Sequence, residues 1–174
     1  MAKPGQAALA GELAAHALKE LIARQPLFAG LADRQLQLLA ADALEMRFEA
    51  GESLFTEGST ANRFYLILEG KVVIETELME RAAFPIQTLG PGDDLGWSWL
   101  FPPYVLHLGA RALVPTKTIF FFGPRLREQC DQDHEFGYEI MQRVARVLIQ
   151  RLQATQLRLT ENLVKSAVPT GTVP

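Results

Sequence analysis

The chain has few of the residues that build disulfides and metal sites. Cys130 is the only cysteine among 174 residues, which excludes an internal disulfide and a multi-cysteine metal site and is typical of a reducing compartment. A redox role for Cys130 is an alternative to the ordinary role of a half-buried helix cysteine. The three histidines, His16, His107 and His134, lie in separate segments without a His-x-His pair. Since a metal-binding β-roll needs such a pair and a third ligand, we expect no metal site.

Long apolar runs and an excess of positive charge are also absent. The formal net charge of −3 gives no overall attraction to nucleic acid or to a membrane. The N-terminal segment, rich in alanine and leucine, is interrupted by Glu12, His16 and Lys19, so it lacks the pattern of a secretory signal, and no segment approaches membrane-spanning length. We therefore expect a cytoplasmic protein without a membrane partner. Nothing resembles a set of nucleophile, base and acid, so we expect no catalytic residues and no enzyme.

Leucines at helical spacing mark the N-terminal quarter of the chain. Within an alanine-rich segment the apolar residues are Leu9, Leu13, Leu18, Leu21 and Ile22. They predict a first helix that runs to about Arg24 and stops before Pro26. A second helix is expected to begin near Asp33, a residue that suits a helix N-terminus. The candidate core positions after it are Leu36, Leu38, Leu39 and Leu44.

From Met46 onward the apolar period changes to two, in short segments separated by glycines. The apolar positions are Phe48, Leu54, Phe55, Phe64, Leu66, Leu68, Val72, Ile74, Ile86, Leu89, Leu106, Leu108, Ile119 and Phe121. Many short antiparallel strands of this kind close into a barrel or roll. We therefore predict an α+β fold: a double-stranded antiparallel β-roll, like a jelly roll, flanked by N-terminal helices and a long C-terminal helix.

Helical spacing returns after Pro124. A short helix that contains Leu126 is expected to reach about Cys130, and a long helix to run over about 133–163, with Asp133 as its N-cap. The predicted units are a helical arm over 1–25, a roll domain with its long helix over 26–163, and a flexible tail over 164–174.

The segment from Leu89 to Tyr104 is the most informative part of the chain. Gly90, Gly92 and Gly96 permit backbone conformations that a side chain would block. After Gly96 the residues 97–101 predict a single helical turn that ends at the Pro102-Pro103 pair. The free amide groups of such a turn suit an anion.

These motifs resemble the cyclic-nucleotide-binding domain of the catabolite activator and anaerobic regulator family of bacteria. The resemblance extends from about Pro26 to Leu163. It is carried by Pro26–Leu31, Phe48–Glu52, Phe55–Gly58, Phe64–Val72, Leu89–Gly96 and Arg151–Thr155. It implies the roll fold and a dimer through the long helix. In that family a DNA-reading helix-turn-helix domain follows this helix, whereas only 164–174 follow here, so we expect no direct DNA binding.

The same resemblance implies three contacts with a cyclic nucleotide. Backbone amides of the turn bind the cyclic phosphate, an arginine neutralises it, and an acidic residue after the last glycine binds a ribose hydroxyl. Here Trp97 stands at the acidic position, His107 falls at or next to the arginine position, and Arg111 is the nearest guanidinium. Ordinary cyclic AMP should therefore bind weakly or not at all. The candidate pocket comprises Gly96, Trp97, Ser98, Trp99, His107, Arg111 and Thr155.

Three states of this pocket remain open. The aromatic side chains of Trp97, Trp99, Phe101 and Tyr104 could fill it, which would leave a dimeric interaction scaffold. An altered pocket could instead stack an aromatic or apolar small molecule, with His107 or Arg111 taking a carboxylate or phosphate. Cyclic AMP or cyclic GMP could also bind through other contacts. The effector is unknown in each case, and a regulated protein partner is expected in the first two.

The long helix has an apolar stripe that extends beyond what one small roll can bury. Its members are Ile140, Val144, Val147, Leu148, Leu152, Leu159 and Leu163. With the resemblance, this stripe predicts a homodimer through the helix 133–163. The alternative is that the entire stripe belongs to the core. Thr155 matches a position that touches the base in the activator family, and otherwise it is a helix residue at the dimer seam.

Overall fold

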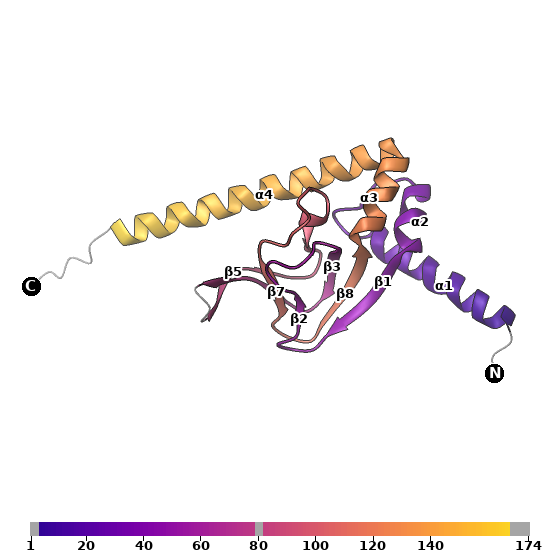
Figure 1. Ribbon diagram of the computed structural model, residues 1–174, viewed down its shortest axis with the longest axis horizontal. Coiled ribbons are helices and arrows are strands. Elements are labelled where there is room, and N and C mark those ends of the chain that lie inside the picture. Colours follow the sequence, from indigo (N-terminus) through magenta and orange to yellow (C-terminus); the bar gives the residue numbers. More distant parts are fainter. Residues whose placement is uncertain (1–3, 79–81, 168–174) are drawn as a thin grey trace, which may run out of the picture.

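The computed structural model of the protein describes residues 4–78 and 82–167. Helices open the chain, a β-roll follows, and helices close it (Figure 1). The helices are α1 (Pro4–Ala23), α2 (Asp33–Ala41), a short 3-10 helix η1 (Trp97–Trp99), α3 (Gly123–Gln132) and α4 (His134–Ala167). The strands are β1 (Ala43–Phe48), β2 (Ser53–Phe55), β3 (Arg63–Glu69), β4 (Val72–Leu78), β5 (Ala82–Leu89), β6 (Asp94–Leu95), β7 (Gly109–Ala112) and β8 (Thr116–Phe122). The predicted α+β roll with a long C-terminal helix is confirmed.

The strands form two four-stranded antiparallel sheets. One sheet has the order β1-β8-β3-β6 and the other β2-β7-β4-β5, so each mixes strands that are distant in the chain. In the first sheet Phe64 pairs with Phe121 and Leu66 with Ile119, while Leu66 also pairs with Asp94 of β6. This pairing places β6, and with it the segment of the candidate pocket, beside β3 at the edge of the sheet.

Strand β3 is buried on both faces. Phe64 and Leu66 belong to the core between this sheet and the helices, whereas Tyr65 and Ile67 belong to the core inside the roll. All four side chains have exposed fractions of 1% or less. Because successive strand residues point to opposite faces, a continuous apolar run is what a strand buried on both sides requires.

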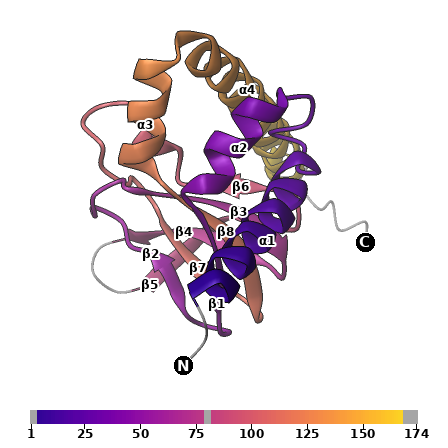
Figure 2. The same ribbon diagram turned by 90° about the vertical axis from the view of Figure 1, so that its right-hand side faces the viewer.

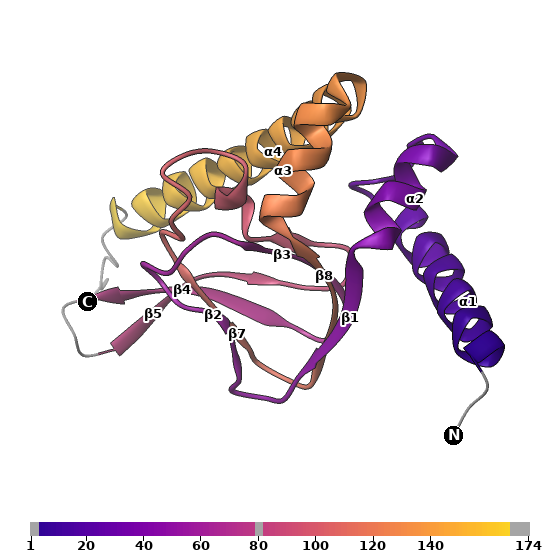
Figure 3. The same cartoon turned by 45° about the vertical axis from the view of Figure 1, so that its right-hand side comes forward.

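The four helices cover the outer face of this sheet. Figure 2 looks onto this end of the molecule, where α1, α2 and α3 lie on the viewer's side of the roll. Figure 3 shows α1 and α2 beside β1, and α3 and α4 above β3 and β8. From α4, Phe136, Ile140 and Val144 are buried in the shared core. Among the described residues no helix is both long and apolar enough to cross a bilayer.

Two of the candidate core positions, Leu38 and Leu44, and the apolar strand position Ile86 are not fully buried. Leu44 of β1 has an exposed fraction of 60%, although it lies on the same strand face as Met46 and Phe48, which pack in the core inside the roll. Ile86 of β5 is 47% exposed, since β5 is an edge strand of its sheet. Leu38 is partly buried on α2.

The break between α3 and α4 is confirmed, and Asp133 caps α4 as predicted. The backbone N–H of Phe136 donates to Asp133 Oδ1 at 3.0 Å, which satisfies one of the free amides of the first turn. The two helices approach closely at Gly137, where an added Cβ would lie 2.8 Å from the carbonyl oxygen of Cys130. Helix α4 continues to Ala167, beyond the expected end at Leu163.

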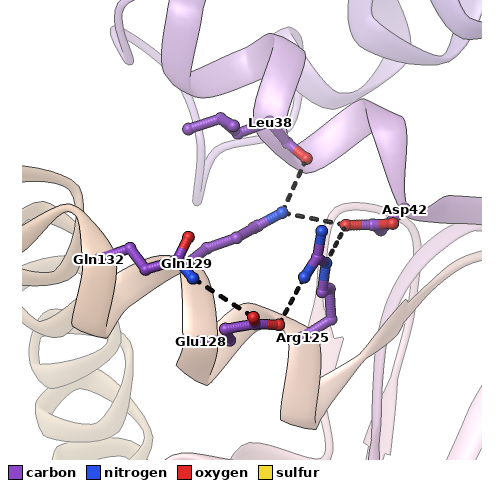
Figure 4. A network of polar contacts seen from close by, with 6 residues as sticks. All are labelled: Leu38, Asp42, Arg125, Glu128, Gln129 and Gln132. Atoms are coloured by element: carbon purple, nitrogen blue, oxygen red, sulfur yellow. Dashed lines mark hydrogen bonds and ion pairs between the residues drawn. The ribbon is translucent and has the colours of Figure 1, made fainter.

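A polar network joins α3 to the end of α2 (Figure 4). The buried side-chain amide of Gln129 donates to the carbonyl oxygen of Leu38 at 3.2 Å and to Asp42 Oδ2 at 3.1 Å. Arg125 also donates to Asp42 Oδ2, at 3.0 Å. On the exposed side of α3, Gln132 donates only to Glu128, at 3.3 Å.

We expect Gln129→Ala to lower the free energy of unfolding by about 1–3 kcal/mol, because it leaves the Leu38 carbonyl without its side-chain donor in a buried position. Urea-induced unfolding followed by circular dichroism measures the loss. The matched control is Gln132→Ala, which removes an exposed bond on the same helix and should change stability by less than about 0.5 kcal/mol. Equal losses in the two variants would contradict a structural role for the buried amide.

Candidate functional site

The turn of the candidate site depends on Gly96. This residue links β6 to η1 with a φ of 94°, in the left-handed region, and an added Cβ would collide with the backbone oxygen of Arg63. Gly92 also has a positive φ, of 88°. Gly90 was predicted to need the same freedom, but its φ is not positive and the space around it is open. The predicted single turn after Gly96 is present as η1.

A cavity of about 250 Å³ opens beside this turn, between the roll and α4. Four of the predicted site residues line it: Gly96, Trp97, Ser98 and His107. The rest of its lining is mostly apolar and includes Ile74, Ile86 and Leu108. His107 is exposed and lies in a bend before β7, whereas we expected it within a strand.

The aromatic side chains between Trp97 and Tyr104 lie in different environments. Trp99 is 1% exposed and lies in the core shared with the helices, and Trp97 packs on Phe64 with 4.5 Å between ring centroids. Phe101 is 48% exposed, and the ring of Tyr104 lies 4.1 Å from the guanidinium carbon of Arg127. Only Trp97 among them lines the cavity, so these rings do not fill it together.

Arg111 is not among the residues that line the cavity. It lies on β7, where its neighbours Ala110 and Ala112 are buried and Arg111 points to the other face. There its Nε and Nη2 donate to the two carboxylate oxygens of Glu75 at 2.9 and 2.6 Å. The expectation that Arg111 could take an anion in the pocket is therefore corrected by the alternation of the strand.

Thr155 also lies outside the cavity lining. It is exposed on α4, and its hydroxyl donates to the carbonyl oxygen of Arg151, one turn earlier, at 2.9 Å.

The cation at the cavity is Arg151 of α4, a residue that our sequence reasoning did not assign to the site. Its Nη2 donates to Asp94 Oδ1 at 2.9 Å and also to the backbone oxygen of Asp94. Asp93 is exposed and accepts from the Gly90 amide at 2.8 Å. Asp94 instead forms a strand pair with Leu66 and is 3% exposed.

Burial dominates the ionisation of Asp94. It raises the pKa of this carboxyl from 3.8 to about 6, although the positive charge of Arg151 acts in the opposite direction. The indole N–H of Trp97 also favours the ionised form, but its geometry falls short of a hydrogen bond. The pKa of Asp94 is raised even though an arginine lies beside it. The free energy lost when the carboxylate is removed from water therefore exceeds the free energy gained from the ion pair.

We expect Asp94→Asn to flatten the pH dependence of stability between about pH 4 and 6. The folded-state pKa is raised, so the native protein binds this proton more tightly than the unfolded chain, and the wild type loses stability as the pH rises through that window. The loss is on the order of 2–3 kcal/mol. Urea unfolding at a series of pH values measures it, with Asp93→Asn as the exposed control. Parallel profiles for wild type and Asp94→Asn would contradict the assignment.

The environment of Cys130 and the placement of the acidic groups bear on reactivity and on metal binding. Burial raises the pKa of Cys130 to about 11, with smaller contributions from Asp131 and Asp133, so the thiol is protonated at neutral pH and a poor nucleophile. No group of three or more His, Cys, Asp and Glu side chains in the described part of the chain is placed to hold a metal ion.

Comparison with known proteins assigns the family. Residues 45–133 match the model of the cyclic nucleotide-binding domain. Over 152 residues the chain is 26% identical to the CRP-like cAMP-activated global transcriptional regulator of Mycobacterium tuberculosis, covering 87% of this chain and 66% of that regulator, which is just under two thirds of its length.

Two crystal structures are also similar to the chain. A proposed cyclic nucleotide-binding protein from Geobacter metallireducens is 31% identical, with a TM-score of 0.71 over 77% of this chain and 97% of that one. The N-terminal domain of a transcriptional regulator from Streptomyces coelicolor is 28% identical, with a TM-score of 0.61 over 77% and 94%. With the match to the domain model, these findings show that the chain belongs to the cyclic nucleotide-binding domain family, of the kind found in CRP-like regulators.

Proposed function

We propose that this protein is a regulatory, ligand-sensing domain whose cavity no longer accepts ordinary cyclic AMP or cyclic GMP. The observation that carries the proposal is the position of the charges around the cavity. Arg111 is paired with Glu75 on the other face of its strand, and Arg151 is paired with Asp94. Arg111 points away from the cavity, a cyclic phosphate would have to displace Asp94 from Arg151, and Trp97 offers no acceptor for a ribose hydroxyl. Losing one charged partner typically costs about 2–5 kcal/mol of binding.

The open cavity argues against the scaffold alternative. If aromatic side chains had replaced the ligand, they would meet in that space, whereas Trp99 and Tyr104 pack elsewhere. The second candidate function is cyclic nucleotide binding through other contacts. Membership in the family and the presence of Arg151 at the cavity favour it.

We expect no binding heat when the purified protein is titrated with cyclic AMP or cyclic GMP up to about 1 mM, a limit that corresponds to roughly 4 kcal/mol of binding free energy. Isothermal titration calorimetry makes the measurement. Unfolding midpoints with and without each nucleotide give an independent check, because any ligand of the native state raises the midpoint. Micromolar binding of either nucleotide would establish the second candidate instead.

We further propose that the domain is a homodimer through α4. The face toward the roll carries Phe136, Ile140 and Val144, while a neighbouring face remains exposed. That second face has the spacing of a coiled-coil seam. Its members are Met141, Ala145, Leu148, Leu152, Thr155 and Leu159. Leu152 and Leu159 are each 58% exposed, on a helix whose C-terminal part extends past the roll in Figure 1.

We expect Leu152→Glu to convert a dimer of the wild type into a monomer, because two glutamates would face each other across the seam. Light scattering coupled to size-exclusion chromatography measures the mass. The matched control is Gln153→Glu, which adds the same charge at an exposed position outside the seam and should leave the dimer intact. A wild type that is monomeric at about 100 μM would reject the proposed interface.

A further inference from the structure

Two hollows meet at one arginine. The cavity of about 250 Å³ beside η1 and a groove of about 540 Å³ along α4 share two lining residues, Gln87 and Arg151. These two side chains therefore form the partition between the hollows. The cavity lies just below the range of about 300–1,000 Å³ that holds drug-sized ligands, so it has room for a small molecule.

The cavity combines an apolar wall with a single fixed charge. Among its described lining residues Arg151 is the one formally charged side chain, and His107 is the one other titratable group. The larger part of the wall consists of aliphatic and aromatic side chains, including Ile74, Leu108 and Trp97. Such a lining suits a ligand with an apolar body and one anionic group, rather than a sugar phosphate with many hydroxyls.

Only one of the three guanidinium nitrogens of Arg151 donates a hydrogen bond among those described. Both of its hydrogen bonds, to Asp94 Oδ1 and to the Asp94 backbone oxygen, start from Nη2. The two faces on which a guanidinium binds a carboxylate through paired N–H groups, Nε with Nη2 and Nη1 with Nη2, both include this nitrogen. Nη2 has one N–H on each of these faces and two acceptors from Asp94, so a carboxylate that binds Arg151 with paired bonds takes at least one of these N–H groups from Asp94.

We propose that the cavity binds a small amphipathic carboxylate, with an aromatic or aliphatic body against the roll, and that its carboxylate displaces Asp94 from Arg151. The inference deepens the proposed function and rests on it, since it names the class of ligand for the same site. When Arg151 changes partner, the Asp94 carboxylate takes up one proton from solvent and stays buried as a neutral acid.

The direction of the proton follows from the surroundings of Asp94. Burial already raises its pKa to about 6, and Arg151 is the strongest influence that lowers it. Removing that influence moves the pKa further up, while the neighbouring Asp93 acts in the same upward direction. Arg143 and Arg146 of α4 line the groove together with Asp94, and His107 lines the cavity. Ligand binding near neutral pH should therefore consume a proton.

The test is calorimetric titration of the full chain with 2-naphthoate and with its neutral analogue 2-naphthamide at pH 7. We expect the carboxylate to bind at least about tenfold more tightly than the amide, the ratio that one charged partner provides at minimum. Repeating the titration in phosphate and in Tris, whose ionisation enthalpies differ, gives the number of protons bound. That number should approach one for 2-naphthoate and zero for 2-naphthamide.

Variants separate the roles of the two charges. Asp94→Asn should bind 2-naphthoate more tightly than the wild type, with no proton uptake, because the competitor has become neutral. The double variant Asp94→Asn/Arg151→Gln, which leaves no buried unpaired charge, should bind carboxylate and amide equally. Arg111→Gln, which removes a guanidinium on the other face of β7, should behave as the wild type. Circular dichroism and the unfolding midpoint of each variant verify its fold.

Three results would overturn the inference. They are no binding of 2-naphthoate by the wild type, equal affinities for acid and amide in the wild type, and an unchanged preference for the acid in the double variant. Failure of the proposed function is a separate result, since it is micromolar binding of cyclic AMP or cyclic GMP. A protein that binds neither the nucleotides nor 2-naphthoate would keep the proposed loss of nucleotide binding and reject the carboxylate.

Discussion

Burial of strand β3 on both faces is the constraint on which the rest of the molecule depends. Phe64 and Leu66 cannot face water, so a helical layer must cover the outer side of their sheet. Tyr65 and Ile67 require the second sheet to close over the inner side. Helix α4 supplies part of this helical cover and then continues beyond it (Figure 1). In doing so it passes the cavity, to whose lining it contributes Arg151.

The ion pair between Arg151 and Asp94 lies where these layers meet. A charge on β6 and a charge on α4 are both largely removed from water, and each depends on the other. The attraction does not make up for the lost hydration of the carboxylate, as the raised pKa of Asp94 shows. A contact of this kind holds α4 to the roll less firmly than apolar packing does. It is therefore a suitable point for a ligand to act on the helix.

Local features of this chain could be predicted because neighbouring residues cause them. Asp133 caps α4 through an amide three residues away, and Gly96 takes a left-handed conformation that begins a turn of three residues. The alternating apolar positions predicted the roll. Leu44 and Ile86 fit that apolar pattern and are nevertheless exposed, because burial at the end of β1 and on the edge strand β5 depends on which strands pair, and pairing is not local.

The sequence by itself determined the class of fold, the helical turn after Gly96 and the replacement of the expected acidic residue by Trp97. Only the tertiary structure decided which arginine reaches the cavity. Arg111 is four residues from His107 in the chain but points to the opposite face of its strand, whereas Arg151 is distant in the chain and lies at the cavity wall. The reason is that strand alternation and helix packing, rather than separation along the chain, decide where a side chain's charge is placed.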